Sequence, residues 1–63
     1  MTLAEAKKIA KEHDQYIGKL TAEKDSQGEY NVYNDGMYIS SSYSANATEA
    51  KIGAVLYVCG INY

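Results

Sequence analysis

The sequence predicts a small α+β domain, in which helices cover one face of a three-stranded antiparallel sheet in the order α-β-β-β-α. Three observations lead to this class. They are a helix-start signal at the N-terminus, a tight-turn dipeptide between two alternating runs, and helix start and stop signals around the last apolar segment. A chain of 63 residues makes one domain, residues 1–63, with a small core.

Residues 2–13 are expected to form a helix. Thr2 and Glu5 have the T-x-x-E spacing of a capping box, in which each side chain accepts a hydrogen bond from the other residue's backbone N–H. Apolar residues recur at helical spacing on one face, namely Leu3, Ala6, Ile9 and Ala10. The opposite face carries Lys7, Lys8, Lys11 and Glu12, and we interpret these lysines as solvated surface rather than a phosphate-binding face.

A change to a period of two follows the helix and predicts a strand over residues 16–23. Residues 24–28 are then polar and end in Gly28, as a hairpin connection requires. We expect this loop to join the first strand to the second.

The Asp35-Gly36 dipeptide lies between two alternating runs and predicts a type I′ hairpin loop, since both central residues of that loop need positive φ. Counting outward gives the expected pairs: Asn34 with Met37, Tyr33 with Tyr38, Val32 with Ile39, and Tyr30 with Ser41. This register directs an apolar set toward the helices, namely Tyr30, Val32, Met37 and Ile39. It directs a polar set outward, namely Glu29, Asn31, Tyr33, Tyr38, Ser40 and Ser42.

The last apolar segment has two interpretations. Asn46 and Glu49 have capping-box-like spacing, Gly60 stands where a helix places its C′ glycine, and Ile61 follows as the hydrophobic partner. We therefore favour a helix over residues 46–59. The alternative is a fourth strand, α-β-β-β-β, because residues 52–59 are rich in β-branched and aromatic types. In either case the core is expected to comprise Leu3, Ile9, Leu20, Val32, Ile39, Val55 and Leu56.

Few residues could carry chemistry. The chain has one histidine, His13, and one cysteine, Cys59, without a phosphate-binding glycine motif or metal-ligand spacing. We therefore expect no catalytic, cofactor or metal site, and no enzyme. A single cysteine cannot form an internal disulfide, the N-terminus lacks a signal-peptide core, and the longest apolar run is too short to cross a bilayer. The expected location is the cytoplasm.

The charge distribution is more informative. The formal charge is −2, so we expect no direct nucleic-acid binding and no membrane anchoring. Residues 14–35 carry five acidic residues against two lysines, a net −3. This acidity is either solubilising surface or a docking patch that mimics nucleic acid toward a basic protein complex. As a docking patch it comprises Glu23, Asp25, Glu29, Tyr33, Asp35 and Tyr38.

Two resemblances bear on function. The α-β-β-β-α order resembles the double-stranded-RNA-binding domain, but residues 48–52 lack that family's basic cluster, so RNA binding is not expected. Residues 1–34, with MTLAEAKKIAKEH and then GEYNVY, resemble small phage and mobile-element proteins of the anti-CRISPR type. That resemblance implies a non-enzymatic inhibitor of a nucleic-acid-handling complex, located in the host cytoplasm if a phage encodes the protein. The alternative is a regulatory or assembly module, such as an antitoxin-like partner or a homodimerising protein; the chain itself is expected to be a monomer or homodimer.

Overall fold

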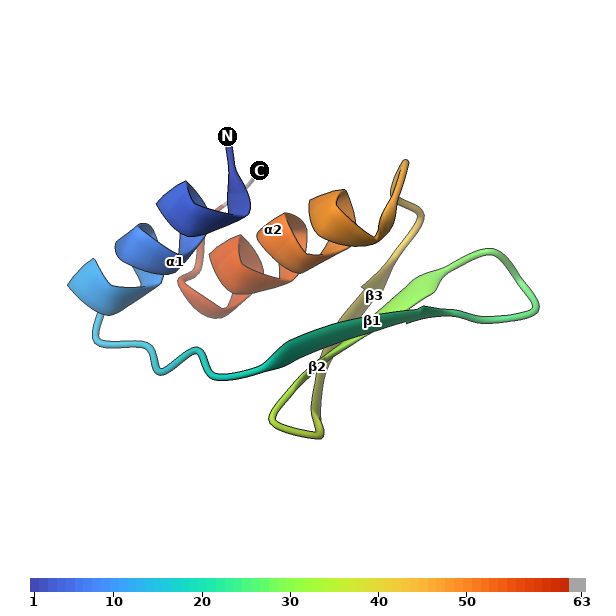
Figure 1. Ribbon diagram of the computed structural model, residues 1–63, viewed down its shortest axis with the longest axis horizontal. Coiled ribbons are helices and arrows are strands. Elements are labelled where there is room, and N and C mark those ends of the chain that lie inside the picture. The colour runs from blue at the N-terminus through green and yellow to red at the C-terminus, as the bar shows by residue number, and fades with distance from the viewer. Residues whose placement is uncertain (62–63) are drawn as a thin grey trace.

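The computed structural model describes residues 1–61 and has the predicted order of elements (Figure 1). These elements are α1 (Leu3–Glu12), β1 (Leu20–Lys24), β2 (Tyr30–Asn34), β3 (Met37–Ser42) and α2 (Ala47–Val58). The strands form one antiparallel sheet in the order β1-β2-β3, and both helices lie on the same side of it. The last element is the predicted helix, so the alternative of a fourth strand is wrong.

The capping signals at both helix starts are confirmed. The Thr2 N–H donates to Glu5 Oε1 at 2.7 Å, and the Glu5 N–H donates to Thr2 Oγ1 at 3.1 Å, which completes the capping box. At the start of α2, Asn46 Oδ1 accepts from the Glu49 N–H at 2.9 Å. These side chains satisfy backbone donors that have no partner within the helix.

Both helices end in the same way. Gly60 has φ of 73°, the Gly60 N–H donates to Tyr57 O, and the Ile61 N–H donates to Leu56 O, which is the bond pattern of a Schellman motif. At the end of α1 the left-handed position is taken by Asp14, with φ of 57°, and the Gln15 N–H donates to Ala10 O at 2.8 Å. The predicted stop at Gly60 is thus confirmed.

The first strand begins later than expected. The prediction placed it over residues 16–23, whereas β1 spans Leu20–Lys24. Residues 16–19 instead run as a connection that is bound to the next turn, because Asn34 Oδ1 accepts from the Gly18 N–H at 2.8 Å and Asn34 Nδ2 donates to Tyr16 O at 3.0 Å. A side-chain amide here replaces the backbone ladder that a longer strand would have used.

The hairpin turn is as predicted, but the register is not. Asp35 and Gly36 have φ of 50° and 84°, and the first pairs, Asn34 with Met37 and Tyr33 with Tyr38, are confirmed. Beyond them the expected pairs are wrong: Val32 lies opposite Ser40, not Ile39, and Tyr30 lies opposite Ser42, not Ser41. A β-bulge leaves Ile39 as one extra residue on β3, and this residue packs against the core.

The bulge also changes which side chains face the helices. Ser40 and Ser42 were expected on the outer face, but they lie opposite inward-facing residues and point toward α2. Ser41 points the other way. Met37 was expected to pack on a helix, yet it is 75% exposed, because the hairpin tip extends beyond the helices (Figure 1).

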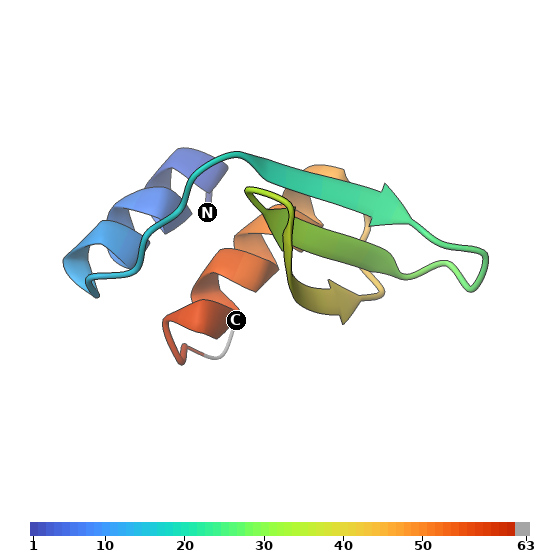
Figure 2. The ribbon, with the colours of Figure 1, turned by 90° about the horizontal axis from the view of Figure 1, so that it is seen from below.

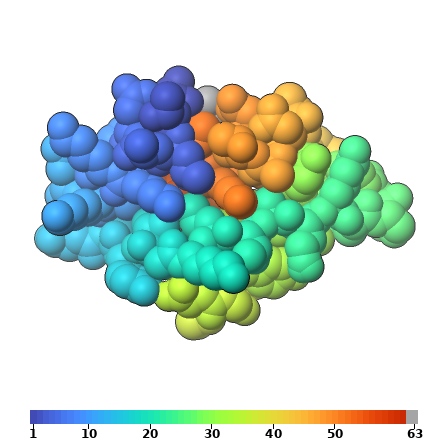
Figure 3. All heavy atoms as spheres, in the orientation of Figure 1, coloured from blue at the N-terminus to red at the C-terminus, as the bar shows by residue number. Residues whose placement is uncertain are grey.

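Helix α2 forms the centre of the core because it packs against all three strands and against α1. The buried set includes four of the expected residues, Leu20, Val32, Val55 and Leu56, while Leu3, Ile9 and Ile39 are partly buried against it. The other buried residues are Ala6, Ala10, Ala50, Ile52 and Ala54. The space-filling view shows α1 lying directly against α2 above the first strand (Figure 3).

Candidate functional site

One face of the sheet is not covered by either helix (Figure 2). We call this the outer face and define it by Thr21, Glu23, Asn31, Tyr33, Tyr38 and Ser41, which are cross-strand neighbours by register. The Tyr33 and Tyr38 rings meet edge to face, with centroids 5.9 Å apart and planes at 69°. Tyr38 is 59% exposed and Tyr33 is half-buried, so this pair is accessible to a partner.

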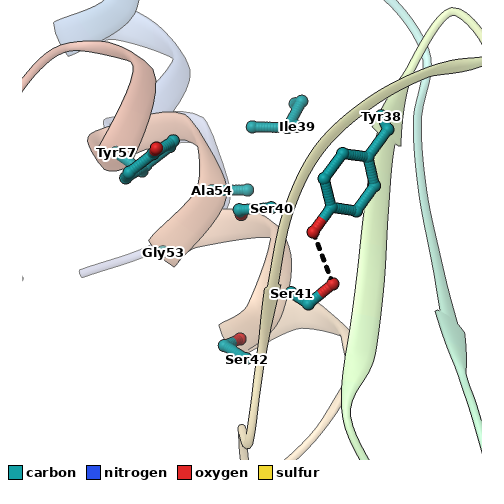
Figure 4. Close-up of a pocket in the computed structure, with 8 residues that line it drawn as sticks. All are labelled: Tyr38, Ile39, Ser40, Ser41, Ser42, Gly53, Ala54 and Tyr57. Atoms are coloured by element: carbon teal, nitrogen blue, oxygen red, sulfur yellow. Dashed lines mark hydrogen bonds between the residues drawn. The ribbon is translucent and has the colours of Figure 1, made fainter.

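Hydrogen bonds hold the Tyr38 ring in place. Its hydroxyl lies 2.7 Å from Ser41 Oγ (Figure 4). The Ser41 hydroxyl in turn donates to Asn31 Oδ1 on the neighbouring strand. The sequence prediction missed Ser41, because only the bulge turns its side chain to this face. On the outer face, Tyr38 thus has a partner for its hydroxyl, Ser41, and a partner for its ring, Tyr33.

Asp25 organises the loop between β1 and β2. Its Oδ1 accepts from the backbone N–H groups of Gln27 and Glu29 at 2.9 and 3.0 Å. Desolvation raises the pKa of Asp25, but the hydrogen bonds from the Glu29 and Gln27 backbones outweigh it, and the pKa lies below its ordinary value. This carboxylate is exposed and stays ionised at neutral pH.

Asp35 joins the hairpin turn to the connection before β1. Its Oδ1 accepts from the Lys19 N–H and its Oδ2 accepts from the Tyr16 hydroxyl, both at 2.8 Å. The Lys19 backbone bond and then the Tyr16 bond lower the pKa of Asp35, while the same hydrogen bond raises the pKa of Tyr16. Gly18 passes so close to this carboxylate that a Cβ there would collide with it.

The structure brings together only part of the predicted site. Glu23, Tyr33 and Tyr38 lie on the outer face, whereas the other three residues lie at its two ends. Asp25 and Glu29 belong to the loop at one end of β2, and Asp35 belongs to the turn at the other. The acidic groups thus flank the tyrosine pair along the strand direction instead of forming one cluster.

Comparison with known proteins adds no assignment. No protein-family model, no curated protein and no solved structure matches the chain. Within residues 1–61, no three histidine, cysteine, aspartate or glutamate side chains gather closely enough to hold a metal ion. In the same part of the chain, no helix has the length and apolar character needed to cross a membrane. The fold and the outer face define a small α+β protein with an uncovered, tyrosine-bearing sheet face.

The carboxylate bonds predict a pH dependence. The pKa values of Glu5, Asp25 and Asp35 are lower in the folded protein than in the unfolded chain, where they are about 4. The stability that these three carboxylates contribute is therefore complete above about pH 4, and it is lost as the pH falls through their folded-state pKa values. Asp35→Asn should lower the free energy of unfolding at neutral pH. This free energy should then fall less toward acidic pH in the variant than in the unmodified protein. Asparagine also tolerates the positive φ of this turn, so the turn itself is retained.

Urea midpoints measured from about pH 2 to about pH 7 test this expectation. Asp14→Asn is the matched control, because it makes the same change at another position of positive φ without touching the Asp35 hydrogen bonds. If the urea midpoint depends on pH in the same way in Asp35→Asn and in the unmodified protein, the Asp35 hydrogen bonds do not contribute to the pH dependence of stability.

Proposed function

We propose that this protein is a non-enzymatic binding protein whose outer face docks on a basic protein surface, and that the partner it inhibits is a nucleic-acid-handling complex. The observation that carries the proposal is the Tyr33–Tyr38 pair, fixed in orientation on the sheet face that neither helix covers. An uncovered face with a pre-ordered aromatic pair is suited to protein contact.

Tyrosine suits this role for a physical reason. The ring supplies a large apolar area, the hydroxyl supplies a polar tip, and only two side-chain torsions must be ordered on binding. Here part of that ordering is already complete, because Tyr38 is held by both the Tyr33 ring and the Ser41 hydroxyl. Such aromatic anchors contribute a large share of the binding free energy in many interfaces.

The acidic groups at both ends of the outer face favour a basic partner. Glu23 is exposed on the face itself, and Asp25 and Asp35 are exposed beyond its two ends. The lowered pKa values of Asp25 and Asp35 keep them ionised below neutral pH. Negative charge spaced along a strand would attract a basic protein surface that otherwise binds phosphates. Covering that surface would inhibit the nucleic-acid-handling complex to which it belongs.

Replacing both tyrosines is expected to remove most of the affinity. Truncation of one central interface aromatic costs about 2 kcal/mol or more, which is a factor of about 30 in affinity, so Tyr33→Ala/Tyr38→Ala should weaken binding by at least about that factor. A partner captured from host lysate by the tagged chain is first identified, and its affinity for each purified variant is then measured by calorimetry. Adding the chain should also displace labelled duplex DNA from that partner.

The matched control is Tyr43→Ala/Tyr57→Ala, which removes two tyrosines that are exposed but do not belong to the outer face. This control should bind as the unmodified protein does. If a folded Tyr33→Ala/Tyr38→Ala variant keeps full affinity, the contact surface lies elsewhere, and the lysine face of α1 (Lys7, Lys8 and Lys11) is the next to be tested.

A further inference from the structure

The hairpin turn contains a chemically reactive pair of residues. Asp35 is directly followed by Gly36, and both residues are exposed. The other two aspartates, Asp14 and Asp25, precede residues that have side chains, and the sequence has no Asn-Gly dipeptide. A Cβ built at Gly36 would meet no atom within 4 Å, so the space beside its backbone is open.

The reaction open to such a pair is isomerisation through a cyclic imide. The Gly36 backbone nitrogen attacks Cγ of a protonated Asp35 side chain, and the carboxyl hydroxyl and the amide hydrogen leave as water, which closes a succinimide ring. A side chain on the attacking residue hinders this step, and glycine has none. Water then opens the ring at one of its two carbonyls. Opening at the main-chain carbonyl leaves the peptide link on Cγ, which is isoaspartate, so the two steps together consume nothing.

The folded protein restrains the Asp35 carboxylate through the connection before β1. Its Oδ1 accepts from the Lys19 N–H and its Oδ2 accepts from the Tyr16 hydroxyl, both at 2.8 Å. A Cβ at Gly18 would collide with the same carboxylate, which therefore lies directly against the Gly18 backbone. Ring closure removes one oxygen from Cγ and draws the other into the plane of the ring, so the two hydrogen bonds cannot both survive it.

The ionisation of Asp35 acts in the same direction. The hydrogen bond from the Lys19 backbone and then the one from the Tyr16 hydroxyl lower the pKa of Asp35. The carboxylate is the unreactive form, because it has no hydroxyl that can leave as water. The bonds to residues 16 and 19 therefore reduce the reactive fraction near neutral pH, in addition to holding the side chain in place.

We propose that Asp35 is a site of spontaneous isomerisation to isoaspartate, and that its contacts with Tyr16, Gly18 and Lys19 restrain this reaction in the folded protein. The rate is then set by how often the connection of residues 16–19 separates from the hairpin turn. The contacts that join the two segments have a chemical role as well as a structural one.

Isoaspartate at this position would alter the outer face. Its main chain is one carbon longer and its carboxylate is attached to Cα, so the two-residue loop loses the geometry of a type I′ turn. Tyr33 and Tyr38 each lie two residues from this loop, one on either side, and their rings meet across it. The modification therefore displaces the tyrosine pair without changing either tyrosine.

The rate of isomerisation is measured on the full chain at one temperature and near-neutral pH, folded in buffer and unfolded in guanidinium chloride. An endoproteinase that cleaves before aspartate but not before isoaspartate leaves a resistant peptide across residue 35, and mass spectrometry quantifies it over time. Asp35 should isomerise in the unfolded chain. In the folded protein it should react at least about tenfold more slowly, because two hydrogen bonds have to break first.

Tyr16→Phe removes the hydroxyl that binds Oδ2 and keeps the ring. The folded variant should isomerise about fivefold faster than the unmodified protein, which is the factor expected for one hydrogen bond. Tyr43→Phe is the matched control, because it removes a hydroxyl from an exposed tyrosine outside the turn, and its rate should not change. All three proteins should react at one rate in guanidinium chloride, and circular dichroism confirms that they are folded in buffer.

The proposal is overturned if the unfolded chain forms no isoaspartate at residue 35, if the folded and unfolded unmodified proteins react equally fast, or if folded Tyr16→Phe and Tyr43→Phe react alike. The first two outcomes need no variant, so they decide the question without a folded Tyr16→Phe. In the purified isoaspartate form, the nuclear Overhauser effect between the Tyr33 and Tyr38 rings should be lost, and its persistence would overturn the effect on the outer face. None of these measurements requires the binding partner.

Discussion

Leu56→Ala is expected to leave a large fraction of the protein unfolded at 25 °C. Leu56 is 1% exposed and lies on α2, the element that contacts α1 and every strand. Truncating a buried leucine to alanine costs about 2–5 kcal/mol, because both the transfer free energy and the packing of the vacated space are lost. The core of a domain this small rarely supplies more than about 3–5 kcal/mol of net stability, so the loss is comparable with the whole.

Urea unfolding followed by far-UV circular dichroism measures this effect as a shift of the midpoint. Tyr57→Ala is the matched control, since it truncates the next residue of the same helix, whose side chain is 66% exposed. Its free energy of unfolding should change by no more than about 0.5–1 kcal/mol. Equal midpoints for Leu56→Ala and the unmodified protein would place residue 56 outside the core.

Ala6→Leu is expected to have the second largest effect, through overpacking. Ala6 and Ala10 are both fully buried where α1 packs against α2, so their methyl groups set how closely the helices approach. Extra methylene groups in a close-packed interior cost about 1–3 kcal/mol, because neighbouring side chains leave their preferred rotamers or the backbone moves. A leucine here has to push α1 away from α2.

Ala4→Leu adds the same side chain to the exposed part of the same helix and serves as the control. Alanine and leucine have similar helix propensities, so Ala4→Leu should change the free energy of unfolding by less than about 0.5 kcal/mol. Thermal and urea unfolding of the two variants separate overpacking from any effect of leucine on the helix. Equal stability of both would mean that the interface between the helices has room for a larger residue.

The features that the sequence predicted correctly depend on short-range interactions. Thr2 caps α1 through a residue three positions away, the left-handed Gly60 ends α2 one residue after its cap, and Asp35-Gly36 closes a two-residue loop. Each of these arrangements is stable only with particular residue types within about one turn of helix or hairpin, so the local sequence is sufficient to identify it. The two tyrosines next to this loop were therefore paired correctly.

The features that the sequence did not predict depend on contacts between distant segments. The β-bulge places Ile39 against the core and turns Ser41 outward, because this arrangement fits the packing of β3 on α2 rather than the alternation within the strand. Asn34 and Asp35 hold residues 16–19 across 16 or more positions of sequence, which shortens the first strand. The residues that tie Tyr38 to its neighbours therefore follow from tertiary packing, which no local pattern of residues encodes.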